Sequence, residues 1–263
     1  MTKTTLLSAL GLLALTLSAP GASLITNGSL DAWDPVTGTP PAGRPLGWYV
    51  LPSVTQTAGL TSGSVYSATL PGTGPLVQTT SAQASNFTMS YNFVATAANG
   101  GNAGMRLDLL NASEQIVMAF AFFNDPTGLR LTAYSSASTS WVTIATGIVP
   151  SVYDSANGVY TTSNVYSFGL TADWANATYS LTIGPAGGSQ TTYSNLNYYY
   201  STPNSAALNK IYFRNVSGGA SLGTFAVDNV TLDSVPEPGT VALLGLGMTG
   251  VLLGVYRRRV ARV

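Results

Sequence analysis

The 263-residue chain contains no cysteine and no histidine, and only 8% of its residues carry a charge. The absence of cysteine excludes disulfides, thiol nucleophiles and cysteine-based metal sites. The absence of histidine removes the commonest general base and the commonest metal ligand. Together the two absences exclude nucleophilic catalysis by Cys-His or Ser-His pairs.

The few charges are segregated along the chain. Between Leu24 and Val235 there are five basic and nine acidic residues, so the formal charge of this central portion is −4. Such a portion lacks the basic footprint that binds phosphate backbones, so nucleic acid is not an expected partner. With 45% hydrophobic residues in the chain, the central portion is expected to fold.

The first 23 residues have the parts of a secretory signal peptide. Lys3 gives a short positive region, residues 6–17 form an apolar core, and small residues follow at 19 and 21–23. This order predicts export, with signal peptidase removing residues 1–23 after Ser23. The alternative is an uncleaved first helix, which the helix breakers after the apolar run disfavour.

A second apolar run extends from Val241 to Tyr256 and contains sixteen residues without a charge. As a helix it would span roughly 24 Å, a little less than the hydrocarbon core of a bilayer at about 30 Å. Flanking residues can cover such a shortfall. The run predicts a transmembrane helix over 241–256, with the following arginines in the cytoplasm and the large domain outside. The alternative is a core helix of a soluble domain.

The segment around this run has a pattern of three parts. They are the sorting motif Val235, Pro236, Glu237 and Pro238, the apolar run, and the basic tail Arg257, Arg258 and Arg259. The arrangement resembles the PEP-CTERM sorting signal of Gram-negative bacteria, which occurs together with an N-terminal signal peptide. The resemblance covers residues 235–263. It implies that exosortase, a membrane protease-transferase, recognises the motif and processes the protein.

The same resemblance implies a route and a destination. The protein would lie in the inner membrane, transiently or permanently, with its domain outside, and would then reach the cell surface or the extracellular medium. There it would lie among exopolysaccharide. A removable hydrophobic tail parallels the GPI signal, which leaves no transmembrane helix in the mature protein. We therefore expect a signal peptide over 1–23, a domain over 24–234 and a sorting signal over 235–263.

The portion between the two ends reads as β-structure throughout. Residues 86–93 (NFTMSYNF) alternate, with four apolar residues on one face. Residues 105–110 alternate with Arg106 and Asp108 outward, and the apolar run 116–123 is typical of a strand buried on both sides. Turns rich in Gly, Asn and Pro separate these and further strands. The pattern predicts an all-β fold, a single antiparallel β-sandwich or jelly roll. Residues 173–183 (DWANATYSLTI) and 209–215 (NKIYFRN) resemble concanavalin-like and laminin-G-like sandwiches, and two further stretches resemble carbohydrate-binding modules.

Two stretches resemble jelly-roll carbohydrate-binding modules. Residues 25–50 (ITNGSLDAW…PLGWYV) are similar to the opening of such modules, and residues 225–232 (FAVDNVTL) to their closing strand. In these modules the first and last strands lie together and sometimes hold a structural calcium ion. The resemblance therefore implies calcium at Asp31 and Asp228, where backbone carbonyls would complete the six to eight oxygen ligands.

The two aspartates also have a structural interpretation. Asp31 would then begin a turn, and Asp228 would cap or solvate a strand edge. The dipeptide Leu30-Asp31 departs from the modules, which have an aromatic residue followed by Glu at this place. No cofactor other than calcium is implied.

The domain contains few residues that could act as a general acid or base. A glycoside hydrolase needs two carboxyl groups about 5–10 Å apart. Glu114 is the only glutamate between Leu24 and Val235, and it lies in NASE, a sequence typical of a hairpin turn. The aspartates are scattered, and no pair stands out. The sequence therefore predicts a protein that is not an enzyme.

Aromatic residues are the candidates for sugar binding, because aromatic faces and a few polar side chains commonly hold sugars. Consecutive tyrosines cannot all point the same way in a strand, so at least one of three in a row should be exposed. Trp48, beside a strand, is expected in the core. The candidates are Trp33, Trp141, Trp174, Tyr198, Tyr199 and Tyr200.

Three functions remain open at this point. The first is a non-catalytic surface or matrix protein with structural or adhesive contacts to exopolysaccharide. The second is a carbohydrate-binding module with a defined glycan ligand. The third, disfavoured by the missing histidine and the lone glutamate, is a polysaccharide-active enzyme on a concanavalin-like sandwich.

Overall fold

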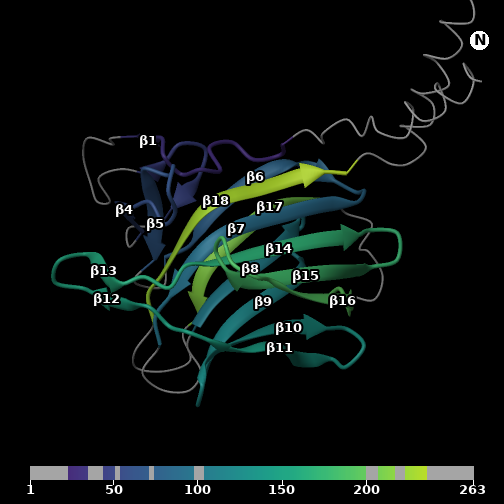
Figure 1. Cartoon of the computed structure of the whole chain (residues 1–263). Coiled ribbons are helices and arrows are strands. Elements are labelled where there is room, and N and C mark those ends of the chain that lie inside the picture. The colour runs from purple at the N-terminus through teal and green to yellow at the C-terminus, as the bar shows by residue number, and fades with distance from the viewer. Residues whose placement is uncertain are drawn as a thin grey trace, which may run out of the picture. The chain divides into compact units, whose positions relative to one another are not determined.

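The computed structural model describes residues 23–34, 44–50, 54–70, 74–97, 104–199, 207–216 and 223–235. These residues form strands and turns, which confirms the all-β prediction (Figure 1). Within these ranges, no helix has the length and apolar character needed to cross a membrane. Residues 1–22 of the predicted signal peptide 1–23 and the predicted transmembrane run 241–256 lie outside the described residues.

Seven strands form one large sheet, which we call sheet I. Each strand runs antiparallel to its neighbours, as expected for strands joined by short turns. In spatial order they are β11 (Ser140–Ile148), β10 (Gly128–Ser135), β9 (Ile116–Asp125), β8 (Gly104–Asn111), β17 (Leu208–Val216), β6 (Leu76–Gln83) and β3 (Tyr49–Val50).

Seven further strands form the second large sheet, sheet II. In spatial order they are β16 (Thr191–Asn197), β15 (Thr178–Pro185), β14 (Tyr166–Asp173), β7 (Phe87–Ala95), β18 (Phe225–Ser234), β5 (Tyr66–Leu70) and β4 (Thr55–Ala58). Two small hairpins complete the described strands. They are β1 (Trp33–Asp34) with β2 (Arg44–Pro45), and β12 (Val152–Asp154) with β13 (Val159–Thr162). The second hairpin projects from the sandwich in Figure 1.

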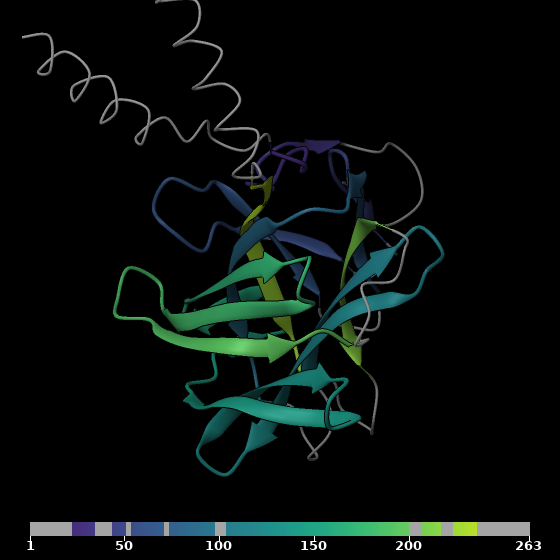
Figure 2. The ribbon, with the colours of Figure 1, turned by 90° about the vertical axis from the view of Figure 1, so that its right-hand side faces the viewer.

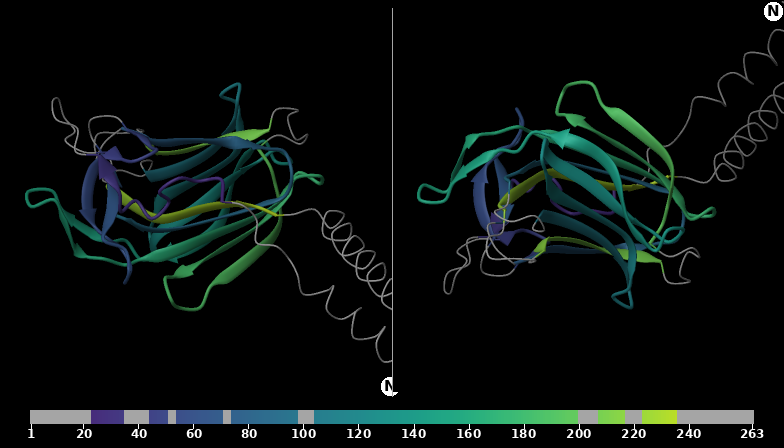
Figure 3. Two further views of the ribbon diagram at one scale, coloured as in Figure 1. Left: turned by 90° about the horizontal axis from the view of Figure 1, so that it is seen from above. Right: turned by 90° about the horizontal axis from the view of Figure 1, so that it is seen from below.

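Sheets I and II face each other as the two layers of a sandwich (Figure 2 and Figure 3). The alternation predicted for 86–93 is realised in β7, whose odd-numbered residues Phe87 to Phe93 are buried. Tyr91 of β7 packs edge-on against Phe213 of sheet I, with ring centroids 5.1 Å apart. Aromatic contacts of this kind join the two layers into one core.

Strand β9 is buried on both of its faces, as its continuous apolar run predicts. Phe120 and Phe122 point into the core. Ala119 and Ala121 point outward, yet their exposed fractions are only 1% and 2%. Larger side chains on the neighbouring strands must therefore cover the outward face of β9, and these side chains form the candidate site below.

The beginning and the end of the sandwich lie side by side. Ser23 forms a β-bridge with Asp233, and the N–H of Leu24 donates to the carbonyl oxygen of Leu232 at 2.7 Å. Ser23–Asp233 form one compact unit. The predicted signal-peptidase site after Ser23 therefore lies beside Asp233 of β18. The sorting motif begins two residues after Asp233, at Val235.

Candidate functional site: a cationic–aromatic sheet face

The outward face of sheet I carries charged and aromatic side chains that lie in register on neighbouring strands. On β8, Leu107 points into the core, and the alternation turns Arg106 and Asp108 outward as predicted. Pairing with β17 places Arg214 opposite Arg106 and Tyr212 opposite Asp108. Because directly opposed residues share a sheet face, these four side chains lie together.

Asp108 lies at the centre of this group and holds two arginines. The Nε of Arg106 donates to Oδ1 of Asp108 at 2.6 Å. Arg214 donates to Oδ2 through Nε at 3.1 Å, and its Nη2 lies 2.8 Å from the same oxygen in an ion pair. The exposed side-chain fraction is 2% for Asp108, 15% for Arg106 and 35% for Arg214. The buried carboxylate thus orients two guanidinium groups that keep contact with solvent.

Three cations of sheet I lie against aromatic rings. Distances below about 6 Å between a cation and a ring centroid give a favourable cation–π interaction. The distance from the arginine Cζ to the ring centroid is 5.1 Å for Arg106 over Trp141, 5.8 Å for Arg130 over Phe123 and 5.5 Å for Arg214 over Tyr212. Each guanidinium is therefore restricted by a ring as well as by its neighbours.

The aromatic rings also contact one another. Trp141 of β11 meets Phe123 and Tyr134 edge-on, with centroids 6.1 and 5.7 Å apart. Tyr134 in turn stacks on Tyr199, with centroids 4.2 Å apart, and the N–H of Tyr199 donates to the carbonyl oxygen of Val117 at 2.9 Å. All four rings are half-buried. The result is a continuous aromatic surface across β9, β10 and β11.

We call this surface the cationic–aromatic face. It consists of Arg106, Asp108, Phe123, Arg130, Tyr134, Trp141, Tyr199, Lys210, Tyr212 and Arg214. Four of the five basic residues between 24 and 235 belong to it, and the fifth, Arg44, lies on β2. Lys210 forms an ion pair with the exposed Glu114, and the buried Nε of Arg130 has no hydrogen-bond partner.

The outward face of sheet II has a different chemistry. Ser90, Thr182 and Thr231 lie on one row across β7, β15 and β18, and Gly169 of β14 completes it. A hollow of about 420 Å³ lies over this row, lined by serine, threonine, asparagine and glutamine side chains. Its described lining contains no charged residue and no outward aromatic ring. It offers neutral hydrogen bonding without a stacking surface.

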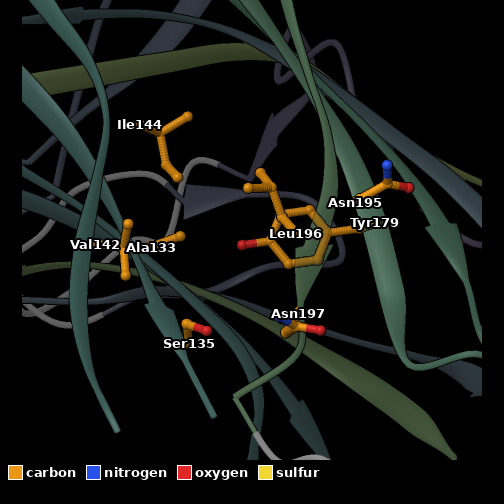
Figure 4. A pocket seen from close by; sticks show the side chains of 8 residues that line it. All are labelled: Ala133, Ser135, Val142, Ile144, Tyr179, Asn195, Leu196 and Asn197. Atoms are coloured by element: carbon orange, nitrogen blue, oxygen red, sulfur yellow. The ribbon is translucent and has the colours of Figure 1, made fainter. Parts of the chain in front are cut away.

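A smaller cavity of about 180 Å³ lies between the edges of the two sheets (Figure 4). Val142 and Ile144 of β11 line one side, and Tyr179 and Leu196 of β15 and β16 line the other. Ligand pockets usually measure about 300–1,000 Å³. The volume and the mostly apolar lining are those of a packing gap at the sandwich edge.

The predicted tyrosine surface is not realised as expected. Tyr198 is 1% exposed and packs against Trp174 and Tyr179, with centroids 5.9 and 6.2 Å away. Its assignment to an exposed binding surface is corrected: a core position explains the side chain, and burial raises the pKa of its hydroxyl. Tyr199 does join the cationic–aromatic face, and Tyr200 lies outside the described residues.

The tryptophans predicted from the sequence occupy three environments. Trp48 is buried in the core, as expected. Trp33 and Trp174 are half-buried and pack against the core; the Nε1 of Trp33 donates to the carbonyl oxygen of Leu30 at 2.5 Å. Trp174 packs on Phe87, with centroids 6.4 Å apart. These packing contacts account for Trp33 and Trp174, whereas Trp141 lies on the cationic–aromatic face.

Asp31 and Asp228 lie in one neighbourhood and bind the same loop, residues 59–65 between β4 and β5. Oδ1 of Asp31 accepts hydrogen bonds from the backbone N–H groups of Val65 and Tyr66 at 2.7 and 2.8 Å. Oδ2 of Asp228 accepts one from the N–H of Leu60 at 2.9 Å. The two carboxylates thus anchor both ends of the loop.

The pKa values of the two aspartates move in opposite directions. For Asp228, burial raises the pKa above the ordinary value of 3.8, against the hydrogen bonds from Leu60 and Asn229, and the charge of Asp31 adds to the rise. For Asp31, burial also raises the pKa, but the hydrogen bonds to its carboxylate outweigh it and the pKa is lowered. Such a divergence occurs in catalytic carboxyl pairs. Here both groups bind loop amides, and Asp228 has no exposed surface.

The same contacts bear on the calcium hypothesis. Calcium needs six to eight oxygen ligands, several of them carboxylate oxygens. Backbone amides donate four hydrogen bonds to the carboxylates of Asp31 and Asp228. In the described ranges, no three acidic side chains gather as a metal site would require. The hydrogen bonds from the loop amides favour an anchoring role for Asp31 and Asp228, and calcium binding by these two residues remains a prediction.

The comparison with protein families identifies the end of the chain. Residues 234–260 match a family model described as "PEP-CTERM protein-sorting motif", which confirms the predicted sorting signal. The motif implies processing by exosortase, export and sorting to the cell surface. Val235 is half-buried after β18, whereas Pro236, Glu237, Pro238 and the basic tail lie outside the described residues. No curated protein sequence matches the chain.

Solved structures with a similar arrangement of strands are distant in sequence. Lectin II from Ulex europaeus has a TM-score of 0.46 at 13% identity, over 74% of this chain and 94% of that chain. The CBM2 module of the evolved Dit of Lactobacillus casei BL23 phage J-1 has a TM-score of 0.46 at 10% identity, over 83% of this chain and 98% of that chain. An engineered GH43 glycoside hydrolase has a TM-score of 0.40 at 15% identity, over 68% of this chain and 36% of that chain. At these TM-scores the likeness says nothing about what this chain binds or does.

Proposed function

We propose that this protein is a non-catalytic, surface-sorted adhesin-like protein whose sandwich binds extracellular polysaccharide through the cationic–aromatic face. The observation that carries the proposal is the aromatic surface of Trp141, Tyr134 and Phe123, bordered by oriented arginines. Sugar rings pack their apolar sides on aromatic faces, while their hydroxyls bind polar groups nearby. The PEP-CTERM motif supports a place outside the cell, where such polymers occur.

The rigidity of the face also supports binding. Side chains held in place before a ligand arrives lose little conformational entropy when it binds. Asp108 fixes Arg106 and Arg214, and the stacked pair Tyr134 and Tyr199 is held by a backbone hydrogen bond to β9. A long polymer can contact the face across β11, β10, β9, β8 and β17 without a deep pocket.

The contacts of four carboxyl groups support a non-catalytic role. Asp108 uses both carboxylate oxygens in ion pairs, and Glu114 pairs with Lys210. Asp31 and Asp228 bind the backbone of the loop between β4 and β5. A general acid or base must reach the reacting proton within hydrogen-bond distance. These four carboxyl groups are instead committed to contacts within the fold.

The membrane steps also belong to the proposal. The run 241–256 would hold the chain in the inner membrane with the sandwich outside, and exosortase would then act at the motif around Pro236 to Pro238. The GPI pathway supports this reading by analogy, because its signal also consists of a recognised site followed by a removable apolar tail.

The experiment uses the protein as its own bacterium releases it and the extracellular polysaccharide of the same culture. Affinity electrophoresis in gels containing the polysaccharide should retard the wild-type protein in a saturable way. A Trp141→Ala/Tyr134→Ala variant should bind at least tenfold more weakly, which corresponds to about 1.4 kcal/mol. Thr192→Ala on sheet II is the matched control and should bind as the wild type does. Equal retardation of all three proteins would refute the proposed face.

A further inference from the structure

We infer that the cationic–aromatic face selects polysaccharides that carry carboxylate groups, such as uronic acids or pyruvate ketals. This inference rests on the proposed function, since it names the class of polysaccharide that the same face binds. It starts from an imbalance of charge between the face and the rest of the sandwich.

The charge of the face is opposite to that of the domain. The portion from Leu24 to Val235 has a formal charge of −4, yet the face contains four cations and one carboxylate, Asp108. Even with Glu114 counted against Lys210, and Asp125 counted because it interacts with the charge of Arg130, the face keeps a formal charge of +1. The hollow on sheet II has no charged residue in its described lining. An anionic ligand would therefore be drawn to sheet I and not to sheet II.

The guanidinium groups retain donors for a carboxylate. A guanidinium has five N–H donors in a planar fork that matches a carboxylate through two parallel hydrogen bonds. In the described contacts Arg106 uses only Nε, and Arg214 uses Nε and Nη2. The Nε of Arg130 is buried without a partner.

The aromatic rings favour a sugar polymer over other polyanions. Sugar rings stack on Trp141 and Tyr134 while a carboxylate substituent reaches the adjacent arginines, so both halves of the face are used. Nucleic acid and polyphosphate carry closely spaced phosphates, and the net charge of −4 on the domain repels such a dense array of charges. A polysaccharide that carries carboxylates on some of its pyranose rings has fewer charges and more ring faces for stacking, so it fits the face better.

The test compares two forms of one polymer. The extracellular polysaccharide of the producing bacterium is used before and after chemical reduction of its carboxyl groups to alcohols, with inorganic polyphosphate as a third probe. The released protein should bind the native polymer at least tenfold more tightly than the reduced one. Binding to the native polymer should also weaken as salt is raised from 50 to 500 mM.

Two variants distinguish a loss of positive charge on the face from a loss of folding. Arg130→Gln removes a cation whose charge acts on Asp125 but which forms none of the ion pairs among the described residues. The sandwich should therefore keep its melting temperature while affinity for the native polymer falls about five- to tenfold. Arg44→Gln removes a basic residue outside the face and should bind as the wild type does.

The outcomes distinguish the two claims. Equal binding of native and reduced polymer, unchanged in Arg130→Gln, would overturn the carboxylate inference and leave polysaccharide binding intact. Binding to neither polymer would overturn the proposed function itself. Polyphosphate bound as tightly as the native polymer would overturn the inference too, because the face would then be a general polyanion site.

Discussion

Asp108 of β8 and Arg214 of β17 are 106 positions apart in the sequence and form an ion pair, in which Nη2 and Nε of Arg214 lie 2.8 and 3.1 Å from one carboxylate oxygen and Nε donates a hydrogen bond to it. The pair exists because β8 and β17 are neighbours in sheet I, in a register that also sets Tyr212 opposite Asp108. Arg106 completes the cluster from β8 itself. A single buried carboxylate therefore organises the cations of the candidate site.

Replacement of Asp108 by asparagine should destabilise the sandwich. Asp108→Asn removes the counter-charge of two arginines, and breaking a fully buried pair costs about 3–5 kcal/mol. Because Arg214 is about one-third exposed and can regain water, we expect a smaller loss of roughly 2 kcal/mol in the free energy of unfolding. Urea denaturation measures it. Glu114→Gln, which removes an exposed ion pair, should change the unfolding free energy by less than about 0.5 kcal/mol. Equal effects of the two variants would contradict the central role of Asp108.

A methyl group at Gly28 should separate the first residues from β18. The Cβ of an alanine there would lie 1.9 Å from the carbonyl oxygen of Val230, a backbone atom that cannot move without disturbing β18. Since the N–H of Val230 also donates to the carbonyl oxygen of Gly28 at 2.7 Å, Gly28→Ala should lower the unfolding free energy by about 1–3 kcal/mol.

Differential scanning fluorimetry tests this prediction through the melting temperature, which should fall by several degrees in Gly28→Ala. Gly188→Ala in the turn after β15 is the control, because its Cβ would come no closer than 3.3 Å to a neighbouring atom, on the side chain of Pro185. A melting temperature of Gly28→Ala equal to that of the wild type would show that residues 23–28 do not stabilise the sandwich.

The two anchoring aspartates should give the unfolding free energy opposite pH dependences. The pKa of Asp31 is lowered in the folded state, so its contribution is present above the ordinary value of 3.8 and is lost as pH falls through the lower folded pKa. The pKa of Asp228 is raised, so its contribution is present below 3.8 and is lost as pH rises through the higher folded pKa.

Urea denaturation of single variants between pH 3 and pH 7 separates these slopes. Asp31→Asn should reduce the loss of unfolding free energy at the acidic end. Asp228→Asn should reduce the loss that occurs as pH rises above 3.8. If Asp228→Asn left the profile above pH 4 unchanged, the carboxyl would not be titrating in the buried site that binds Leu60.

The effect of calcium on the melting temperature distinguishes the two interpretations of Asp31 and Asp228. If these carboxylates anchor the loop through its amides, 1 mM calcium or EDTA should change the melting temperature by less than about 1 °C. A bound ion would raise the unfolding free energy by about 2.7 kcal/mol at a hundredfold excess over its Kd. A rise that Asp31→Asn abolishes would establish the metal site implied by the carbohydrate-module resemblance.

Strand patterns were predictable where one side chain in two is buried. The alternation in 86–93 follows from the residue types, because each strand turns alternate side chains toward the core. The double burial of 116–123 follows from its continuous run of apolar residues. The same alternation placed Arg106 and Asp108 outward. The sorting signal was also readable, because its recognition depends on a short contiguous sequence and not on tertiary contacts.

The candidate site depends on strand pairing that local patterns do not contain. Nothing in NKIYFR shows that Arg214 meets Asp108, because the partner strand is about a hundred residues away. The consecutive tyrosines misled for a related reason. Strand β16 ends at Asn197, and the chain that follows turns Tyr198 into the core and Tyr199 onto Tyr134. The exposure of an aromatic residue is set by the layer beneath it, which sequence spacing does not specify.

The most direct test of the polysaccharide-binding face is hydroxyl-radical footprinting of the released protein, with and without the extracellular polysaccharide of its own bacterium. The account predicts that bound polymer protects Trp141 and Tyr212 of sheet I from oxidation. It also predicts that Tyr66 of sheet II, which is 39% exposed, is oxidised at the same rate in both samples. Protection of Tyr66 with no change at Trp141 and Tyr212 would contradict the assignment of the binding face to sheet I.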